Sequence, residues 1–354
     1  MNARLRKLFL SLHCTEIDAL FVSSSPNVTY LSGFKGVDSW IFLSPAGLYV
    51  ITDSRYSEQA ADEAKGFKII SRDGQSVSEI VAGLVRKHKI KALGFESQIV
   101  THSFYMGLAK PIGIRRLKAM SGLVESLREI KDDFEIGRIK RSVAIAVKGY
   151  HYVRQTAKPG MREREVQARL EYYTKSLGSE RPAFDIIIAA GPRSSMPHCQ
   201  TNQTLIRNNQ VLLVDMGVVY QGYHSDLTRP LFLGKMSTLY KKIYRIVWEA
   251  QRLGIKKAGP GVPASEVDAA CRVAIKKSGY GKFFRHGAGH GVGLEIHEAP
   301  TVSARSKSIL KPGMVITVEP GIYLPGKFGV RIEDMVLITK KGHEVLTRDL
   351  DQPV

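Results

Sequence analysis

Two aspartates stand in apolar surroundings on either side of a predicted turn, in the segment VLLVDMGVVYQGYHSDLTRP. Asp215 belongs to the first β-rich run and Asp226 to the second, and Gln221-Gly222 between them is typical of a two-residue hairpin turn. Because strand side chains alternate between faces, this hairpin would bring both aspartates to one face, with Cα atoms roughly 7–8 Å apart. Carboxylates that converge in this way repel each other unless a cation lies between them. The segment therefore indicates a metal site, with solvent-facing acids at strand ends as the alternative.

The same turn sets the register of the hairpin. With the turn at 221–222, Tyr220 pairs with Tyr223, and Thr228 lies opposite Asp215. Thr228 is therefore either a residue that orients the carboxylate or an ordinary β-branched strand residue.

Two further acids occur in strand-like segments of the C-terminal part. Glu319 ends the apolar run VITVE directly before a Pro-Gly turn, and Glu333 lies in GVRIEDMVLIT. Arg331 precedes Glu333 by two residues, so a continuous strand would place both on one face. From there the arginine would contact the carboxylates of the site and order them. A surface arginine is the alternative.

Three histidines, His286, His290 and His297, occur in the segment HGAGHGVGLEIHE. The four-residue spacing of the first two would suit a zinc pair on a helix. The glycines between and after them argue against a helix and indicate backbone that approaches a site closely. Beside four acids in strand contexts, the cluster predicts that imidazole contributes to the same site.

Two arrangements of elements would position these residues. Up to about residue 120, short β-rich runs alternate with helical patterns, which is typical of an α/β domain. After residue 133 the order helix, helix, strands occurs twice, which indicates two similar halves. We therefore predict two domains, at residues 1–125 and 126–354. The expected elements include strands at 18–22, 40–44 and 48–52, a turn at 24–27, helices at 54–66, 134–153, 166–177, 237–253 and 264–277, and strands around 314–319 and 330–338.

Composition favours a protein without a membrane span in a reducing compartment. The apolar runs of the 354-residue chain stay below the roughly 18 residues of a membrane helix, and no signal-peptide pattern is recognisable. Cys14, Cys199 and Cys271 lie too far apart for a CxxC or zinc-ribbon motif, so we expect a cytoplasmic location without disulfides. The formal net charge of +19 comes without an aromatic stacking motif, so no specific nucleic-acid binding is expected.

Five segments, taken in order, resemble the successive motifs of the pita-bread metallopeptidases: FDIIIAAGPRSSMPHC, VDMG…SDLTR, HGAGHGVGLEIHE, VEPGIY and GVRIED. They most resemble the branch of bacterial Xaa-Pro aminopeptidases and Xaa-Pro dipeptidases. ALFVSSSPNVTYLSGF and ITDSRYSEQAADEA resemble its smaller creatinase-like domain. The resemblance implies an α/β N-terminal creatinase-like domain followed by an α+β pita-bread catalytic domain. Pro230 after SDLTR and Cys199 after His198 depart from the usual motifs and concern the pocket rather than the ligands.

The resemblance also implies two divalent metal ions. Carried over by motif, Asp215 would bind one metal, and Asp226 and Glu333 would bridge both. His290 and Glu319 would complete the second metal. Four oxygen donors and one imidazole suit Mn²⁺, with Co²⁺ or Zn²⁺ as alternatives.

The implied activity is hydrolysis of the peptide bond that precedes proline. Two divalent ions would activate a water molecule and polarise the scissile carbonyl. His198 or His297 would stabilise the oxyanion, and Glu319 would carry the proton to the proline nitrogen. Arg331 and Thr228 would orient the ligands or contact the substrate.

We expect an Xaa-Pro aminopeptidase, a homodimer that acts on peptides with proline in the second position. The alternatives are an Xaa-Pro dipeptidase (prolidase) and a non-catalytic basic binding protein. A dipeptidase would need a group such as arginine for the free carboxylate of its substrate, and the sequence identifies none. The complete set of five ligands argues against a binding protein without activity. Metal content, together with activity on Xaa-Pro peptides of increasing length, discriminates among these functions.

Overall fold

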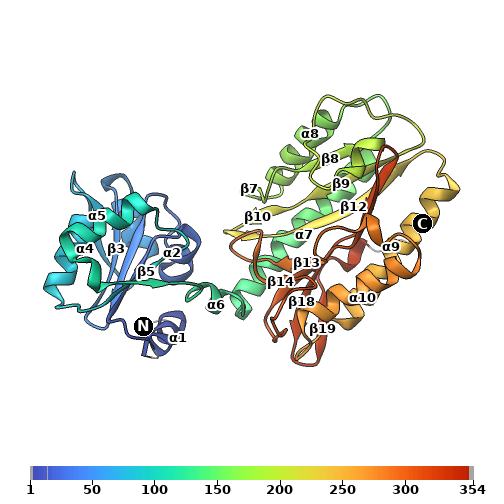
Figure 1. Cartoon of the computed structure of the whole chain (residues 1–354). Helices are drawn as coiled ribbons and strands as arrows, with labels where there is room; N and C mark the ends of the chain where they lie inside the picture. Colours follow the sequence, from blue (N-terminus) through green and yellow to red (C-terminus); the bar gives the residue numbers. More distant parts are fainter. Residues whose placement is uncertain (1–2, 14, 351–354) are drawn as a thin grey trace. The chain divides into compact units, whose positions relative to one another are not determined.

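A computed structural model of the chain describes residues 3–13 and 15–350 (Figure 1). They form two compact units, which divide between Arg128 and Glu129, compared with the predicted boundary at 125/126. Across the described residues, none of the helices is both long and apolar enough to cross a membrane. Cys199 and Cys271 are buried free thiols, and Cys14 lies outside the described residues.

The first unit is an α/β domain built on one mixed sheet, in the order β4-β3-β2-β1-β5-β6. Its helices α4 and α5 pack on one face, where Val81 and Leu108 meet Phe21 and Phe42 of the sheet (Figure 1). The elements are α1 (Ala3–His13), β1 (Ala19–Val22), α2 (Ser25–Ser32), β2 (Trp40–Ser44), β3 (Gly47–Thr52), α3 (Ser57–Glu63), β4 (Lys68–Ser71), α4 (Val77–Lys87), β5 (Leu93–Glu96), α5 (His102–Ile112), β6 (Leu117–Met120) and α6 (Glu125–Arg128).

The predicted turn at 24–27 is wrong, because helix α2 begins there. Ser24 is the N-cap and Pro26 lies in the first turn, where a residue without a backbone N–H costs no helical hydrogen bond. The helix ends at Gly33, whose φ of +83° is the left-handed conformation common after helices. The predicted helix at 54–66 is shorter, since residues 54–56 form a 3₁₀ turn before α3.

The second unit has the order helix, helix, strands twice, as predicted. Helices α9 and α10 cover the five-stranded sheet β14-β13-β15-β18-β19, where Val247 and Cys271 pack with Ile316 and Val336. The elements are α7 (Asp133–Thr156), α8 (Glu163–Ser176), β7 (Arg181–Pro182), β8 (Ile187–Ala190), β9 (Gln210–Met216), β10 (Val218–Tyr220), β11 (Tyr223–His224), β12 (Leu227–Leu233), α9 (Thr238–Lys257), α10 (Ala264–Lys277), β13 (Gly289–Gly291), β14 (Glu298–Val302), β15 (Val315–Val318), β16 (Gly321–Leu324), β17 (Phe328–Arg331), β18 (Asp334–Thr339) and β19 (Gly342–Val345).

The hairpin around residues 221–222 has the predicted register. Tyr220 pairs with Tyr223, and Thr228 pairs with Asp215 on strands β12 and β9. Gln221 and Gly222 have φ angles of +48° and +83°, which are the positive values of the tight turn favoured in hairpins. The pairing is interrupted between the β10–β11 and β9–β12 ladders, and Asp226 lies in this break.

Candidate metal centre

The second unit contains a cavity of about 670 Å³ that brings together residues from distant strands. Asp215 comes from β9 and His290 from β13, while Glu319 follows β15 directly. Every residue predicted for the site except Thr228 lines this cavity: His198, Asp215, Asp226, His290, His297, Glu319, Arg331 and Glu333.

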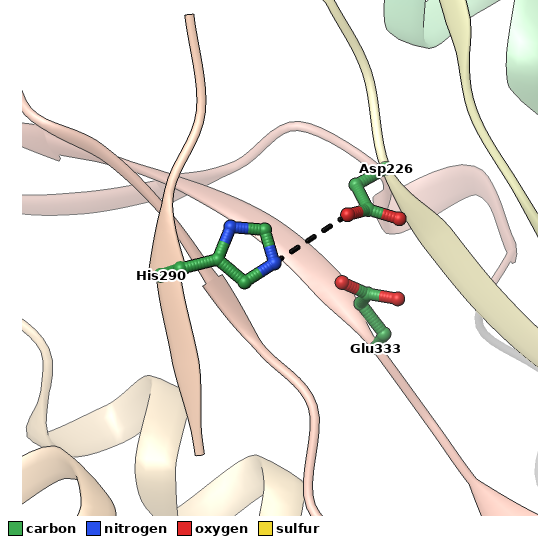
Figure 2. A group of neighbouring side chains, drawn as sticks. All are labelled: Asp226, His290 and Glu333. Atoms are coloured by element: carbon green, nitrogen blue, oxygen red, sulfur yellow. Dashed lines mark ion pairs between the residues drawn. The ribbon is translucent and has the colours of Figure 1, made fainter. Parts of the chain in front are cut away.

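His290 lies between two of the carboxylates. Its Nε2 atom is 3.5 Å from Asp226 Oδ2 and 3.4 Å from Glu319 Oε1. Figure 2 shows the imidazole facing Asp226 and Glu333, and one ligand atom of each of these three residues lies within 4.8 Å of the others. The glycines beside His290 allow this approach, since a side chain at Gly289 would collide with the carbonyl oxygen of Thr317, 2.0 Å from the added Cβ.

The sequence predicted one continuous strand through Arg331 and Glu333, and this prediction is wrong. Strand β17 ends at Arg331 and β18 begins at Asp334, because the chain passes from the β16–β17 pair into the five-stranded sheet. Glu333 lies in this passage, and its backbone N–H donates to Thr228 O (3.1 Å). The break turns the Glu333 carboxylate into the cavity, where Oε2 accepts from the Thr228 hydroxyl at 2.7 Å.

Arg331 forms hydrogen bonds that orient the carboxylates of the site. Its Nη2 pairs with Asp215 Oδ2, its Nε donates to Thr228 Oγ1 (3.1 Å), and its Nη1 donates to Tyr323 Oη (2.8 Å). Thr228 in turn donates to Glu333, so one buried arginine orients Asp215 directly and Glu333 through Thr228. This arrangement is typical of residues that form hydrogen bonds to metal ligands and orient them.

The donor atoms fit a cation. Glu333 Oε1 is buried, and within the described residues no hydrogen-bond donor contacts it. A buried carboxylate oxygen without a partner is costly, and a divalent ion beside it removes that cost. Four acids and one imidazole also form a donor set that first-row divalent metals bind well.

Burial and mutual repulsion make it unfavourable for all these acids to be ionised without a cation. Burial, followed by repulsion from Glu333, Asp215 and Glu319, raises the pKa of Asp226 well above its ordinary value. Burial likewise raises the pKa of Glu333 well above its ordinary range, and that of Glu319 to about 7. Burial and the nearby His297 lower the pKa of His290 to about 4, which leaves its imidazole neutral and able to bind a metal.

The stabilisation by added metal is expected to grow as the pH rises. A carboxyl whose pKa is raised on folding binds more protons folded than unfolded, so the metal-free protein loses stability as the pH rises from 4.5 through about 7 for Glu319. A cation bound to the same carboxylates prevents this loss. The increase in Tm on adding Mn²⁺ to protein treated with EDTA should therefore be larger at about pH 7.5 than at about pH 5.5. An equal increase at both pH values would contradict this electrostatic account.

The three remaining histidines differ in their surroundings. His198 and His297 are exposed in the cavity, and the His297 ring packs edge-on against His290 with centroids 4.3 Å apart. Burial, followed by the nearby His198, lowers the pKa of His297. His286, which the sequence assigned no role, also lines the cavity and contacts Tyr323 Oη through Nε2 (2.9 Å).

Sequence reasoning assigned no role to Tyr323 and Arg164, two polar residues of the cavity. Tyr323 is the last residue of the VEPGIY segment and contacts both Arg331 and His286. Arg164 lies in the first turn of α8, where the sequence carries no signal beyond a helix start. Only the packing of α8 beside strand β8 brings it to the cavity.

Comparisons with known proteins agree with this fold and cavity. Residues 137–340 match the model of metallopeptidase family M24, and residues 4–130 match the Creatinase/Prolidase N-terminal domain. The chain is 39% identical to the Xaa-Pro dipeptidase of Pyrococcus horikoshii, over 98% of this chain and 97% of that protein.

Two solved structures extend the similarity to the whole fold. The Xaa-Pro dipeptidase from Bacillus anthracis is 38% identical, with a TM-score of 0.96 over 99% of this chain and 98% of that one. The X-Pro aminopeptidase from Thermotoga maritima is 36% identical, with a TM-score of 0.90 over 98% and 99%. The chain therefore belongs to metallopeptidase family M24 and carries the Creatinase/Prolidase N-terminal domain ahead of its catalytic domain.

Proposed function

We propose that this metallopeptidase is an Xaa-Pro dipeptidase that uses two divalent metal ions. The observation that carries the proposal is the similarity over the whole chain to proteins named Xaa-Pro dipeptidase, at 38–39% identity, together with five predicted ligands around one cavity. This similarity favours the dipeptidase over the aminopeptidase that the sequence motifs alone suggested. The cytoplasmic location and the homodimer stay predictions.

Five residues would hold the metals. Asp226 and Glu333 are proposed to bridge the two ions, Asp215 to bind one of them, and His290 and Glu319 to bind the other. Mn²⁺ is the proposed metal because four oxygen donors accompany a single imidazole. When bound, such a pair of ions activates a water molecule and polarises a carbonyl.

The remaining steps are assigned to side chains of the cavity. Water adds to the scissile carbonyl carbon, and an imidazole N–H of His198 or His297 donates a hydrogen bond to the developing oxyanion. Glu319 is proposed to accept the proton of the attacking water and to deliver it to the proline nitrogen as the C–N bond breaks. The amide nitrogen must gain a proton to leave as an amine, and the proline nitrogen, which carries no hydrogen before cleavage, would receive it from Glu319.

An Xaa-Pro aminopeptidase is the second candidate. The cavity volume of about 670 Å³ is in the range of sites for drug-sized ligands, so a dipeptide would fill only part of it. The similarity to the X-Pro aminopeptidase from Thermotoga maritima also favours this function.

Substrate length is expected to separate the two activities. For a dipeptidase, kcat/KM for Ala-Pro should exceed that for Ala-Pro-Ala, because binding energy from the free proline carboxylate is lost in the longer peptide. Ala-Ala should be a poorer substrate than Ala-Pro, since the lost contacts of the proline ring amount to about 1–3 kcal/mol.

Steady-state kinetics of the Mn²⁺-loaded protein on these three peptides provides the measurement. Faster cleavage of the tripeptide would identify an aminopeptidase instead. Equal cleavage of Ala-Pro and Ala-Ala would remove the proline preference while leaving the metal centre unaffected.

A further inference from the structure

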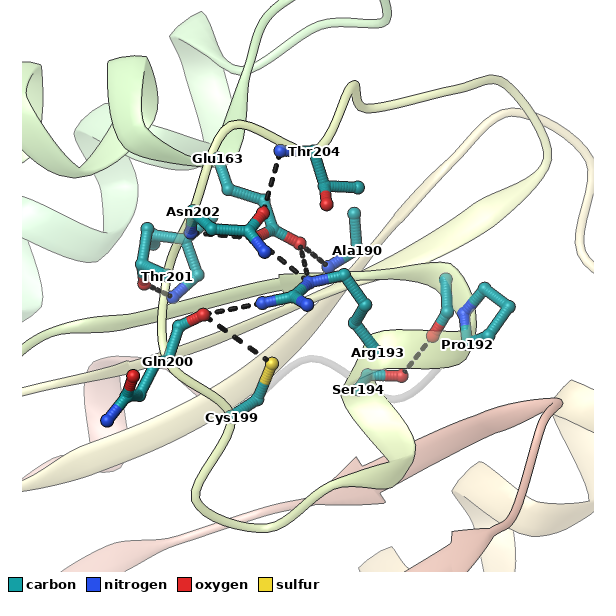
Figure 3. Close-up of polar contacts among 12 residues, drawn as sticks. Glu163, Ala190, Pro192, Arg193, Ser194, Cys199, Gln200, Thr201, Asn202 and Thr204 are labelled. Atoms are coloured by element: carbon teal, nitrogen blue, oxygen red, sulfur yellow. Dashed lines mark hydrogen bonds and ion pairs between the residues drawn. The ribbon is translucent and has the colours of Figure 1, made fainter.

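The loop that carries His198 is held by an ion pair between Glu163, which is buried, and Arg193, which is partly buried (Figure 3). Glu163 at the start of α8 has an exposed fraction of 0%, and its carboxylate accepts from Arg193 Nε (3.0 Å) and from Asn202 N (3.2 Å). Arg193 also donates to the carbonyl of Gln200. The backbone after His198 therefore has a defined position relative to the first turn of α8.

Arg164, the next residue of α8, is hydrogen-bonded to this loop. Its Nη2 donates to Thr201 O at 2.9 Å, and Thr201 is itself fixed because its hydroxyl donates to Ile186 O (2.8 Å) and accepts from Ile188 N (2.8 Å). The Arg164 side chain thus lies against the cavity wall while the residue as a whole remains exposed. Within the described part of the chain, no carboxylate pairs with this guanidinium.

Arg331, the other arginine that lines the cavity, already uses its guanidinium for contacts within the protein. Arg331 is buried and its guanidinium contacts Asp215, Tyr323 and Thr228, besides the carbonyl of Pro197 at 3.3 Å. No lysine occurs among the described residues that line the cavity. Arg164 is therefore the cationic side chain there whose N–H groups remain open to a ligand.

We propose that Arg164 binds a carboxylate of the substrate. Guanidinium donors match a carboxylate with two parallel hydrogen bonds, and the bond to Thr201 O already restricts the side chain, which lowers the entropy lost on binding. Asp185 lines the same cavity, so the cavity wall is not positively charged throughout. The attraction of a substrate carboxylate would therefore come from the Arg164 guanidinium itself. The carboxylate is either the C-terminal group of a dipeptide or an acidic side chain of its first residue. This inference rests on the proposed function for its choice of substrates.

Two ratios of kcat/KM separate the two sources. Gly-Pro against Gly-Pro-amide reports on the terminal carboxylate, and Asp-Pro-amide against Asn-Pro-amide reports on the side chain. In Arg164→Met, one of these ratios should fall by about 10- to 100-fold relative to the wild type, because a charge-assisted hydrogen-bond pair is lost. Arg164→Lys should restore part of the loss. Whichever ratio falls identifies the source.

Arg162→Met is the matched control. Arg162 lies two residues away, is exposed, and donates from Nη1 to Gln203 O (2.7 Å), but it does not line the cavity. Both ratios should be unchanged in this variant. Wild-type ratios in Arg164→Met, or equal losses in the two variants, would overturn the carboxylate site.

Failure of the proposed function would be recognised separately. If the wild-type protein hydrolyses none of the four substrates, the dipeptidase assignment fails before any variant is compared. Calorimetric titration then tests Arg164 without turnover, using proline against prolinamide and aspartate against asparagine. Weaker binding of one carboxylate ligand to Arg164→Met supports the site, and equal binding to both proteins overturns it.

Discussion

Asp226→Asn and Glu333→Gln are each expected to abolish turnover and to lower the metal content of the purified protein. Both carboxylates are proposed to serve two ions at once, so one substitution weakens both sites. Replacing a group that only orients a ligand typically costs about 10–100-fold in metal affinity or activity, and loss of a bridging ligand should cost more. The amides keep nearly the same shape, so the effect would report on charge and coordination rather than on packing.

The measurement combines elemental analysis of the metal bound per chain with kcat/KM at saturating Mn²⁺. Asp185→Asn is the control for metal content, because Asp185 also lines the cavity but belongs to neither of the described ion pairs with His290. Near-normal activity of either metal-loaded amide variant would remove that residue from the ligand set.

His198→Ala and His297→Ala are expected to keep their metal but to lose kcat by about 10²–10³-fold. Both histidines are exposed in the cavity, whereas His290 is the imidazole that faces Asp226 and Glu319. A hydrogen bond to the oxyanion is made more strongly in the transition state than in the bound substrate, so its loss lowers kcat more than it raises KM.

Metal content and the separate values of kcat and KM check this prediction. His151→Ala on α7 is a suitable control, since His151 does not line the cavity. A metal-free His198 or His297 variant would place that histidine among the ligands. Unchanged kcat would show that the imidazole takes no part in the reaction.

Local patterns predicted much of the second unit. The helices at 237–253 and 264–277 were expected within a few residues of α9 and α10, because their apolar residues follow a helical period over several turns. The hairpin register was predicted because the Gln221-Gly222 turn determines which residues face each other. That register places Thr228 opposite Asp215, which is a consequence of the turn alone.

Other elements gave weaker local signals. Helix α2 begins with Ser-Pro, a pair that is also common in turns. The helix is stabilised by the burial of its side chains within the first unit, which the local sequence does not indicate. The strand expected through Glu333 is broken because the chain changes partners from β16 to β15 at that point. Pairing with a distant strand has no signature in the residues on either side of the break.

The sequence by itself determined which chemical groups are available: four acids and a histidine cluster in apolar, glycine-marked segments, in the order of the family motifs. Only the tertiary structure decided how these groups meet. It shows that Arg331 contacts Asp215, that no donor among the described residues reaches Glu333 Oε1, and that Arg164 reaches the cavity from α8. The physical reason is that turns and periodicity act between near neighbours, whereas these contacts join residues far apart in the chain and depend on how whole sheets and helices pack.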